Sequence, residues 1–182
     1  MRWANKQIDD FTLIIDLGEL QEYHISPTFF ENTDQWTTQG QVKIVMQDVK
    51  NEMSRETSRV MTVWQHKGSV SFHAINFKPQ GELSLFSNHI TYIEEVIDSK
   101  TLKTSLQERP YFYEAKLKDE FTRKVLENIP YARRGYAFKN ADLKAYFEAL
   151  PWYIPDPEYK EATLTEDEKA WLKEVRELKI SE

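Results

Sequence analysis

Apolar and polar residues alternate with a period of two along the first part of the chain, which is typical of β-strands. In the segment 42–47, Val42, Ile44 and Met46 form one apolar face. In the run 69–77 the apolar positions change phase after Ala74, which predicts a β-bulge. Further strands are predicted at residues 11–17, 59–65, 69–77, 83–86 and 90–97.

Short polar breaks separate these runs. Gly68 lies in the polar break 66–69 between two strand-like segments, which predicts a hairpin turn. Residues 78–81 and 87–88 predict two further turns, and the polar segment 51–58 is either a loop or a single helical turn. Because the gaps are short, we expect an antiparallel β-meander and not parallel strands joined by helices.

The pattern changes to that of a helix from about residue 114. Leu117, Phe121 and Val125 recur at every fourth position, which predicts an amphipathic helix of about four turns. Pro130 is expected to end or kink this helix, because proline has no amide hydrogen to donate.

Two further helices are indicated by their first residues. Asn140 is the expected N-cap of a helix that runs to about residue 150. Thr165 and Glu168 fit a capping box at the start of a last helix. Together these patterns predict an α+β protein, with a β-rich domain in residues 1–110 and a small all-helical module in residues 111–182. The boundary depends on the change of period, since charge does not distinguish the two parts.

The composition restricts the possible classes of function. The 182 residues include no cysteine, which excludes a disulfide framework, a thiolate nucleophile and a cysteine-ligated zinc site. Glycine occurs only 5 times, so wide glycine-rich phosphate loops are largely excluded. The net charge of −6 argues against a broad phosphate-binding surface, and we therefore expect no nucleic acid partner.

The apolar runs are short throughout the chain. None approaches the roughly 18 residues of a membrane-spanning helix, so we expect no membrane span. The first residues lack the apolar core of a signal peptide. Two alternatives stay open: the protein is cytoplasmic, or a leader has been removed and the protein acts in the cell envelope or outside the cell.

Aromatic residues concentrate in one stretch of the helical part. Residues 131–159 hold a third of all phenylalanine, tyrosine and tryptophan residues. Basic residues are interleaved with these rings, and acidic residues follow them up to residue 168. The rings are Tyr131, Tyr136, Phe138, Tyr146, Phe147, Trp152, Tyr153 and Tyr159.

The segment Tyr131-Ala-Arg-Arg-Gly-Tyr-Ala-Phe138 resembles the signature of the YARHG domain family. The similarity continues through 143–147, 151–157 and 164–169, and covers about residues 114–180. Arg134 occupies the position of the family's histidine, so proton or metal chemistry of that histidine would be absent here. The resemblance implies a small helical module of bacterial proteins, which are often exported or on the cell surface. It implies no enzymatic activity.

The same segment supplies the candidate site residues. In a small domain, large rings are expected to fill the core, and a ligand site is the alternative. Arg133 or Arg134 is expected to pair with the acids of 156–168, or to stack on Tyr136 or Trp152. The candidate binding residues are Tyr131, Arg133, Arg134, Tyr136, Trp152 and Tyr153, of which the last two are expected to be exposed. The candidate structural residues are Gly135, expected to supply a positive φ or a close helix–helix approach, and Phe138, Tyr146 and Phe147.

Other chemically interesting residues have simpler explanations. The four histidines, His24, His66, His73 and His89, do not have the spacing of a helical zinc site, and we expect no metal. The adjacent carboxylates Asp9-Asp10 and Glu94-Glu95 would point to opposite faces of a strand and are expected at the surface. The loop 27–36 is either a recognition loop or a lid that packs its rings over the open end of the β-domain.

The leading functional hypothesis is a non-enzymatic bacterial accessory or binding protein of the cell envelope, with no cofactor. Its partner would be a cell-wall or envelope component or another protein. The alternative is a cytoplasmic protein whose β-domain has a cleft for a small molecule or peptide. A third hypothesis is an enzyme whose site is assembled from distant residues such as His73, His89 and Glu94.

Overall fold

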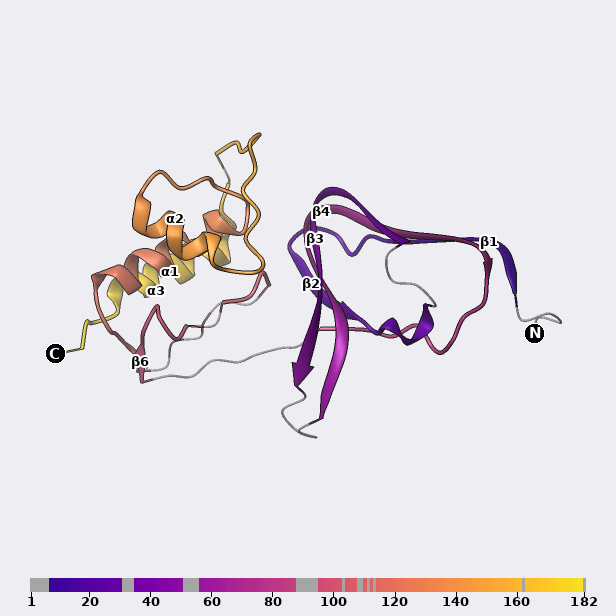
Figure 1. Ribbon diagram of the computed structural model, residues 1–182. Helices are drawn as coiled ribbons and strands as arrows, with labels where there is room; N and C mark the ends of the chain where they lie inside the picture. Colours follow the sequence, from indigo (N-terminus) through magenta and orange to yellow (C-terminus); the bar gives the residue numbers. More distant parts are fainter. Residues whose placement is uncertain are drawn as a thin grey trace. The chain divides into compact units, whose positions relative to one another are not determined.

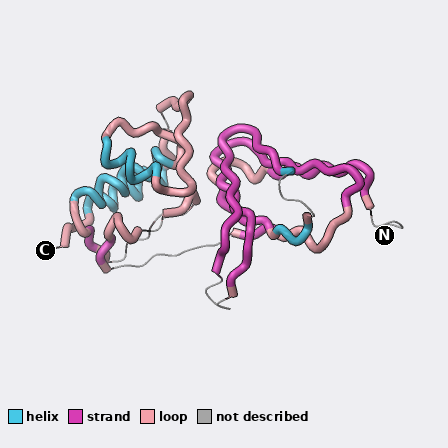
Figure 2. The backbone as a smooth tube through the Cα atoms, in the orientation of Figure 1, coloured by secondary structure: helices cyan, strands magenta, loops and turns pink. Residues whose placement is uncertain are grey.

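The computed structural model describes residues 7–30, 35–50, 56–87, 95–102, 104–107, 110, 112, 114–161 and 163–181. The chain divides into two compact units, residues 1–88 and 89–182. Strands form the first unit and helices dominate the second (Figures 1 and 2), which confirms the predicted α+β class.

The division of the chain lies about 20 residues before the change of period at residue 110. In the segment between them, Leu102 and Leu106 are buried. The carbonyl oxygens of Thr104 and Ser105 accept hydrogen bonds from side chains of the helical part. This segment therefore belongs to the second unit through two buried leucine side chains and through its backbone carbonyls.

A long central strand, β4 (Thr57–Phe77), organises the sheet of the first unit. The strand β3 (Trp36–Lys50) runs antiparallel along one of its edges. On the other edge, β1 (Ile8–Ile15) pairs with residues 70–77 and β2 (Gln21–Ile25) pairs with residues 61–65. The short strand β5 (Leu85–Phe86) extends the sheet beside β2. All these pairs are antiparallel, as predicted, but β1 and β2 pair with β4 and not with each other.

The predicted hairpin turn at residues 66–69 is wrong, because β4 continues through these residues. Gly68 lies opposite Gly40 of β3, and both have positive φ, 115° and 83°. A Cβ atom on Gly68 would lie 2.0 Å from the carbonyl oxygen of Gln39. The glycine therefore permits a close approach of two paired backbones, and the chain does not reverse there.

The predicted bulge in the run 69–77 is not where the register shifts. The shift occurs between Gln41 and Val42, which pair with Lys67 and Gln65 and leave His66 as the additional residue of β4. In the run 69–77 the buried face changes at Asn76, which has a φ of 56°. Ile75 precedes this change and still faces outwards, with 60% of its surface exposed.

The core of the first unit is rich in aromatic rings. The loop 27–36 was predicted either to recognise a ligand or to pack against the β-domain, and the structure favours packing. The ring centroids of Phe30 and Trp36 lie 4.6 and 5.4 Å from the ring centroid of Phe72. Residues 31–34 lie outside the described chain. The buried core residues are Ile15, Tyr23, Ile25, Phe30, Met61, Val63, Val70, Phe72 and Phe77.

Three other predicted segments are described only in part. Of the predicted strand 90–97, the structure describes the end, where β6 (Val96–Ile97) pairs in parallel with β7 (Lys116–Leu117). Asn88 of the predicted turn 87–88 and residues 51–55 of the predicted loop lie outside the described residues.

Three helices form the described part of the second unit: α1 (Glu120–Ala132), α2 (Ala141–Glu148) and α3 (Glu166–Glu177). The predicted caps of α2 and α3 are confirmed, since Asn140 accepts from two backbone amides and Thr165 and Glu168 form a reciprocal capping box. In the described residues, no helix has the length and apolarity needed to cross a membrane.

The first helix differs from its prediction at both ends. It starts after Asp119, whose carboxylate accepts from the amide of Thr122 at 2.7 Å, because the preceding Lys116–Leu117 pairs as a strand. It also continues for two residues beyond Pro130, which lies within its last turn.

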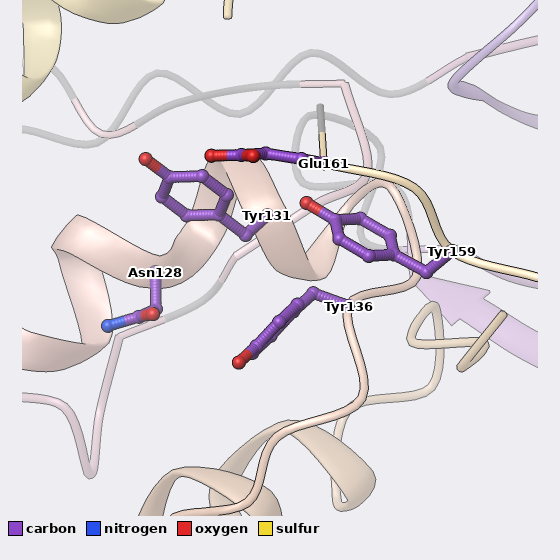
Figure 3. A pocket seen from close by; sticks show the side chains of 5 residues that line it. All are labelled: Asn128, Tyr131, Tyr136, Tyr159 and Glu161. Atoms are coloured by element: carbon purple, nitrogen blue, oxygen red, sulfur yellow. The ribbon is translucent and has the colours of Figure 1, made fainter. Parts of the chain in front are cut away.

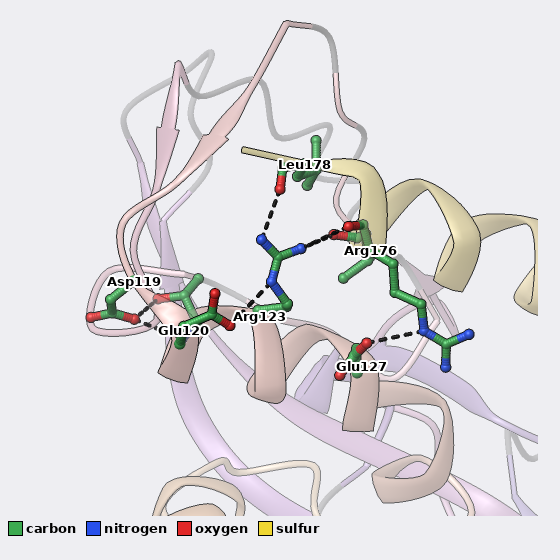
Figure 4. A network of polar contacts seen from close by, with 8 residues as sticks. Asp119, Glu120, Arg123, Glu127, Arg176 and Leu178 are labelled. Atoms are coloured by element: carbon green, nitrogen blue, oxygen red, sulfur yellow. Dashed lines mark hydrogen bonds and ion pairs between the residues drawn. The ribbon is translucent and has the colours of Figure 1, made fainter. Parts of the chain in front are cut away.

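Arg123 of α1 binds the C-terminal end of α3 (Figure 4). Its guanidinium group donates to the carbonyl oxygens of Val175 and Arg176, both at 3.0 Å, and of Leu178 at 2.8 Å. The last carbonyls of a helix lack intrahelical donors and carry partial negative charge. One planar cation therefore satisfies several acceptors and fixes α3 against α1.

Replacing Arg123 with lysine is expected to lower the free energy of unfolding by about 1–2 kcal/mol, because an ammonium group cannot reach three separated carbonyls in this fork geometry. Urea unfolding followed by helical circular dichroism measures the loss. Arg176→Lys is the matched control, since the exposed guanidinium of Arg176 pairs with the carboxylate of Glu127 at 3.1 Å. Equal losses in the two variants would contradict the capping role of Arg123.

Candidate functional site

The segment 131–138 leaves α1 and turns at Gly135, which has a φ of 82°. A Cβ atom there would lie 2.8 Å from the Cβ of Asp156 and 2.9 Å from the carbonyl oxygen of Ile154. The carbonyl oxygen of Gly135 accepts from the amide of Asp156 at 2.8 Å. The predicted positive φ is thus confirmed, whereas the close approach is to the loop at residues 154–156 and not, as the alternative prediction had it, between two helices.

Arg134 forms a two-pronged ion pair with Glu168 of α3. Its two terminal nitrogens donate to the two carboxylate oxygens at 2.6 and 2.8 Å. One of these nitrogens also donates to the carbonyl oxygen of Pro130 at 2.8 Å. The predicted pairing of a signature arginine with the following acids is confirmed for Arg134, which joins the end of α1 to the start of α3.

Glu168 is the acidic partner of this pair and is almost completely buried. Burial by itself raises the pKa of its carboxyl group. The hydrogen bonds from Arg134 and Thr165 outweigh this effect, and the net result is a lowered pKa. The carboxylate is therefore held in its charged form between two donors.

Arg133 is also buried, and its guanidinium donates to the carbonyl oxygen of Ser105 at 3.1 Å. It thereby holds the segment before the first helix against the end of that helix. The structure accordingly places both signature arginines in internal contacts.

The prediction that Trp152 and Tyr153 are exposed is wrong. Trp152 has 1% of its surface exposed, and its indole nitrogen donates to the carbonyl oxygen of Thr104 at 2.8 Å. The hydroxyl of Tyr153 donates to the carbonyl oxygen of Tyr136 at 2.6 Å. The neighbouring prolines turn the chain, but the two rings point inwards, where their centroids lie 6.3 and 6.0 Å from that of Phe147.

The candidate structural rings lie in the same core. Phe138 stacks on Phe147 with ring centroids 4.5 Å apart, and Tyr146 meets Phe147 edge to face at 5.2 Å. Burial raises the pKa of Tyr146 to about 12. These contacts are those of a packed aromatic core.

Two of the candidate binding residues, Tyr131 and Tyr136, are only partly buried and face a pocket of about 450 Å³. Asn128, Tyr159 and Glu161 complete the lining; we call this site the tyrosine pocket. Figure 3 shows the rings of Tyr131, Tyr136 and Tyr159 around the hollow, with Glu161 above it.

Each wall of the tyrosine pocket comes from a different place in the chain. Asn128 and Tyr131 are three residues apart on α1 and therefore share one helix face. Tyr136 follows the turn at Gly135, and its ring meets that of Tyr159 edge to face at 5.2 Å. Phe138 supports Tyr136 from another side at 5.0 Å.

Three residues of the tyrosine pocket were not among the sequence candidates. The sequence indicated two of them weakly. Tyr159 belongs to the aromatic stretch, and Asn128 is three residues before Tyr131, which puts both on one helix face. Glu161 had no signal beyond its place in the acidic run. The contact between residues 135 and 156 brings the later loop to the end of α1, and no sequence pattern reports that contact.

The histidines that the structure describes lie at separate places in the first unit. His24 is buried, bonds Thr62 at 2.9 Å, and has its pKa lowered by burial. His73 meets Asp10 at 2.9 Å on the surface, whereas His89 and Glu94 lie outside the described residues. Where the structure describes the chain, no group of three or more histidine, aspartate or glutamate residues is placed to hold a metal ion.

Residues 100–179 match the YARHG domain family, which confirms the resemblance of the C-terminal part. The matched region includes the signature, the tyrosine pocket and the segment 104–106 that packs against the helices. No curated protein and no solved structure matches the chain.

Proposed function

We propose, from the premise that residues 100–179 of this chain form a YARHG domain, that the protein is a non-enzymatic bacterial binding protein of the cell envelope. The helical unit is its binding module and the tyrosine pocket is its binding site. The partner is a component of the cell wall or envelope, or another protein located there.

The observation that carries this proposal is that the candidate residues fall into two groups, one with structural contacts and one that lines a pocket. Arg133, Arg134, Trp152 and Tyr153 make internal contacts that hold the unit together. Tyr131 and Tyr136 instead place partly buried rings around a pocket. A concave site lined by rings and a few polar groups is the usual form of a ligand site.

The chemistry of the described lining supports binding over catalysis. Tyrosine rings offer faces for stacking, and Asn128 and Glu161 offer hydrogen-bond acceptors. The alternative prediction, a ligand cleft in the β-domain, rests on the sequence alone.

The first test is co-sedimentation of the full chain with isolated bacterial envelopes. Tyr131→Ala is expected to lower the bound fraction, with affinity falling about fivefold or more, because one ring contact contributes on the order of 1 kcal/mol. Alanine is a good helix former, so α1 is expected to persist in this variant.

Phe121→Ala is the matched control. Phe121 is another partly buried ring of α1, but it packs against Tyr146 and does not line the tyrosine pocket. Binding by this variant, once its fold is verified by circular dichroism, should equal that of the intact chain. An intact chain that stays in the supernatant, or an unchanged affinity in Tyr131→Ala, would refute the proposed site.

A further inference from the structure

The polar atoms around the tyrosine pocket are mainly acceptors. Asn128 uses its amide nitrogen to donate to the carbonyl oxygen of Lys124 at 2.7 Å, and its oxygen is an acceptor. Glu161 adds an exposed carboxylate. The cations nearest to Tyr131 and Tyr136 in sequence are Arg133 and Arg134, which donate to Ser105 and Glu168. Neither they nor the exposed Lys124 and Lys160 belong to the lining.

Three tyrosine rings complete this arrangement. An aromatic face carries partial negative charge and attracts a cation positioned over it. Several rings around one hollow, with Tyr136 and Tyr159 perpendicular to each other, offer a cation more than one face. The carboxylate of Glu161 at the rim adds an opposite full charge, which also favours a cation.

Hydrogen bonding distinguishes one kind of cation from another. A primary ammonium group has three N–H donors, which match the carboxylate, the amide oxygen and the phenol oxygens of the lining. A quaternary ammonium has no N–H donor and cannot form these hydrogen bonds. The volume of about 450 Å³ accommodates a side chain of this kind together with part of its backbone.

We propose that the tyrosine pocket binds a primary ammonium group at the end of an alkyl chain, as in a lysine side chain of a peptide. This inference rests on the proposed function and names the chemistry of its ligand. The rings of Tyr131, Tyr136 and Tyr159 surround the ammonium group, and Glu161 balances its charge.

The test uses the full chain and a pair of probes that differ only in the ammonium group. Nα-acetyl-lysine methylamide and Nα-acetyl-norleucine methylamide are titrated into isotope-labelled protein, and binding is followed by NMR. We expect the lysine probe to bind about tenfold more tightly or better, since both cation–π attraction and the Glu161 charge favour it. Choline carries a quaternary ammonium group and is the third probe, and we expect it to bind more weakly than the lysine probe.

Glu161→Gln tests the charge without removing any ring. This substitution is expected to lower the affinity for the lysine probe about fivefold and to leave the affinity for the norleucine probe unchanged. Glu158→Gln is the matched control, because Glu158 is an equally exposed carboxylate of the same loop that does not line the pocket, and its variant should bind like the intact chain.

Equal binding of the lysine and norleucine probes would overturn the inference, as would choline binding that matches lysine or no effect of Glu161→Gln. Those results leave the proposed function intact if envelope binding still depends on Tyr131. Loss of that dependence refutes the proposed function by a separate measurement.

Discussion

Replacing Trp152 with alanine lowers the free energy of unfolding of the helical unit by about 3–5 kcal/mol. The ring is completely enclosed, so its removal leaves a cavity beside Phe147 and Tyr153. The carbonyl oxygen of Thr104 also loses the indole donor at 2.8 Å. Chemical unfolding monitored by helical circular dichroism measures the change.

Trp152→Phe is the control for this substitution. It removes the indole nitrogen but keeps most of the ring, so we expect a clearly smaller loss than for alanine. A loss below about 1 kcal/mol in the alanine variant is the result that an exposed binding ring would give, and it would contradict the buried position.

Replacing Arg134 with methionine is expected to cost about 3 kcal/mol, because the buried carboxylate of Glu168 loses its counter-ion and keeps only the hydrogen bond from the amide of Thr165. Glu168→Gln in the same chain should restore part of the loss, since the neutral amide needs no counter-ion. Measuring both single variants and the double variant gives the coupling energy of the pair. Additive losses would show that the two side chains do not interact.

The pH dependence of the free energy of unfolding provides a second test of the Arg134→Met variant. In the intact chain the folded pKa of Glu168 is lowered, so its stabilising effect is present above its ordinary value of 4.5 and is lost as pH falls through the lowered pKa. Without Arg134, burial is the dominant effect and raises the pKa. The stability difference between the intact chain and the variant should therefore narrow as pH falls, first through the raised pKa of the variant above 4.5 and then through the lowered pKa of the intact chain below 4.5. A constant difference would contradict this account.

Local patterns in the sequence predict the helix starts and one ion pair. Asn140 and Thr165 cap their helices with atoms two or three residues away, and such contacts are visible in a short window. The ion pair of Arg134 was also predictable, although its partner is more distant in the sequence, because a basic stretch of the chain precedes an acidic one. Opposite charges in two adjoining stretches favour pairing whatever the detailed fold.

The errors arise where long-range contacts decide the structure. Gly68 has the sequence surroundings of a hairpin turn, but its position opposite Gly40 depends on the pairing of β3 with β4. Trp152 lies between turn-forming residues, which suggests exposure, while its burial depends on Thr104, 48 residues away. Neither partner can be identified from a local window.

The tyrosine pocket was predictable only in part. Tyr131 and Tyr136 belong to the aromatic signature and were candidates. Tyr159 and Glu161 join them because Gly135 allows the loop at Asp156 to pass close to the end of α1. The pocket is therefore a product of one backbone crossing, and its acceptor-rich character follows from which loop is brought there.

The central claim is that the signature contains two separate sets of residues, one that holds the fold and one that binds. Envelope co-sedimentation of Arg134→Met and Tyr131→Ala, at a temperature where circular dichroism shows both folded, tests this claim most directly. The account predicts that Arg134→Met binds like the intact chain despite its lower stability, whereas Tyr131→Ala binds about fivefold or more weakly. Weaker binding by folded Arg134→Met together with normal binding by Tyr131→Ala would contradict it.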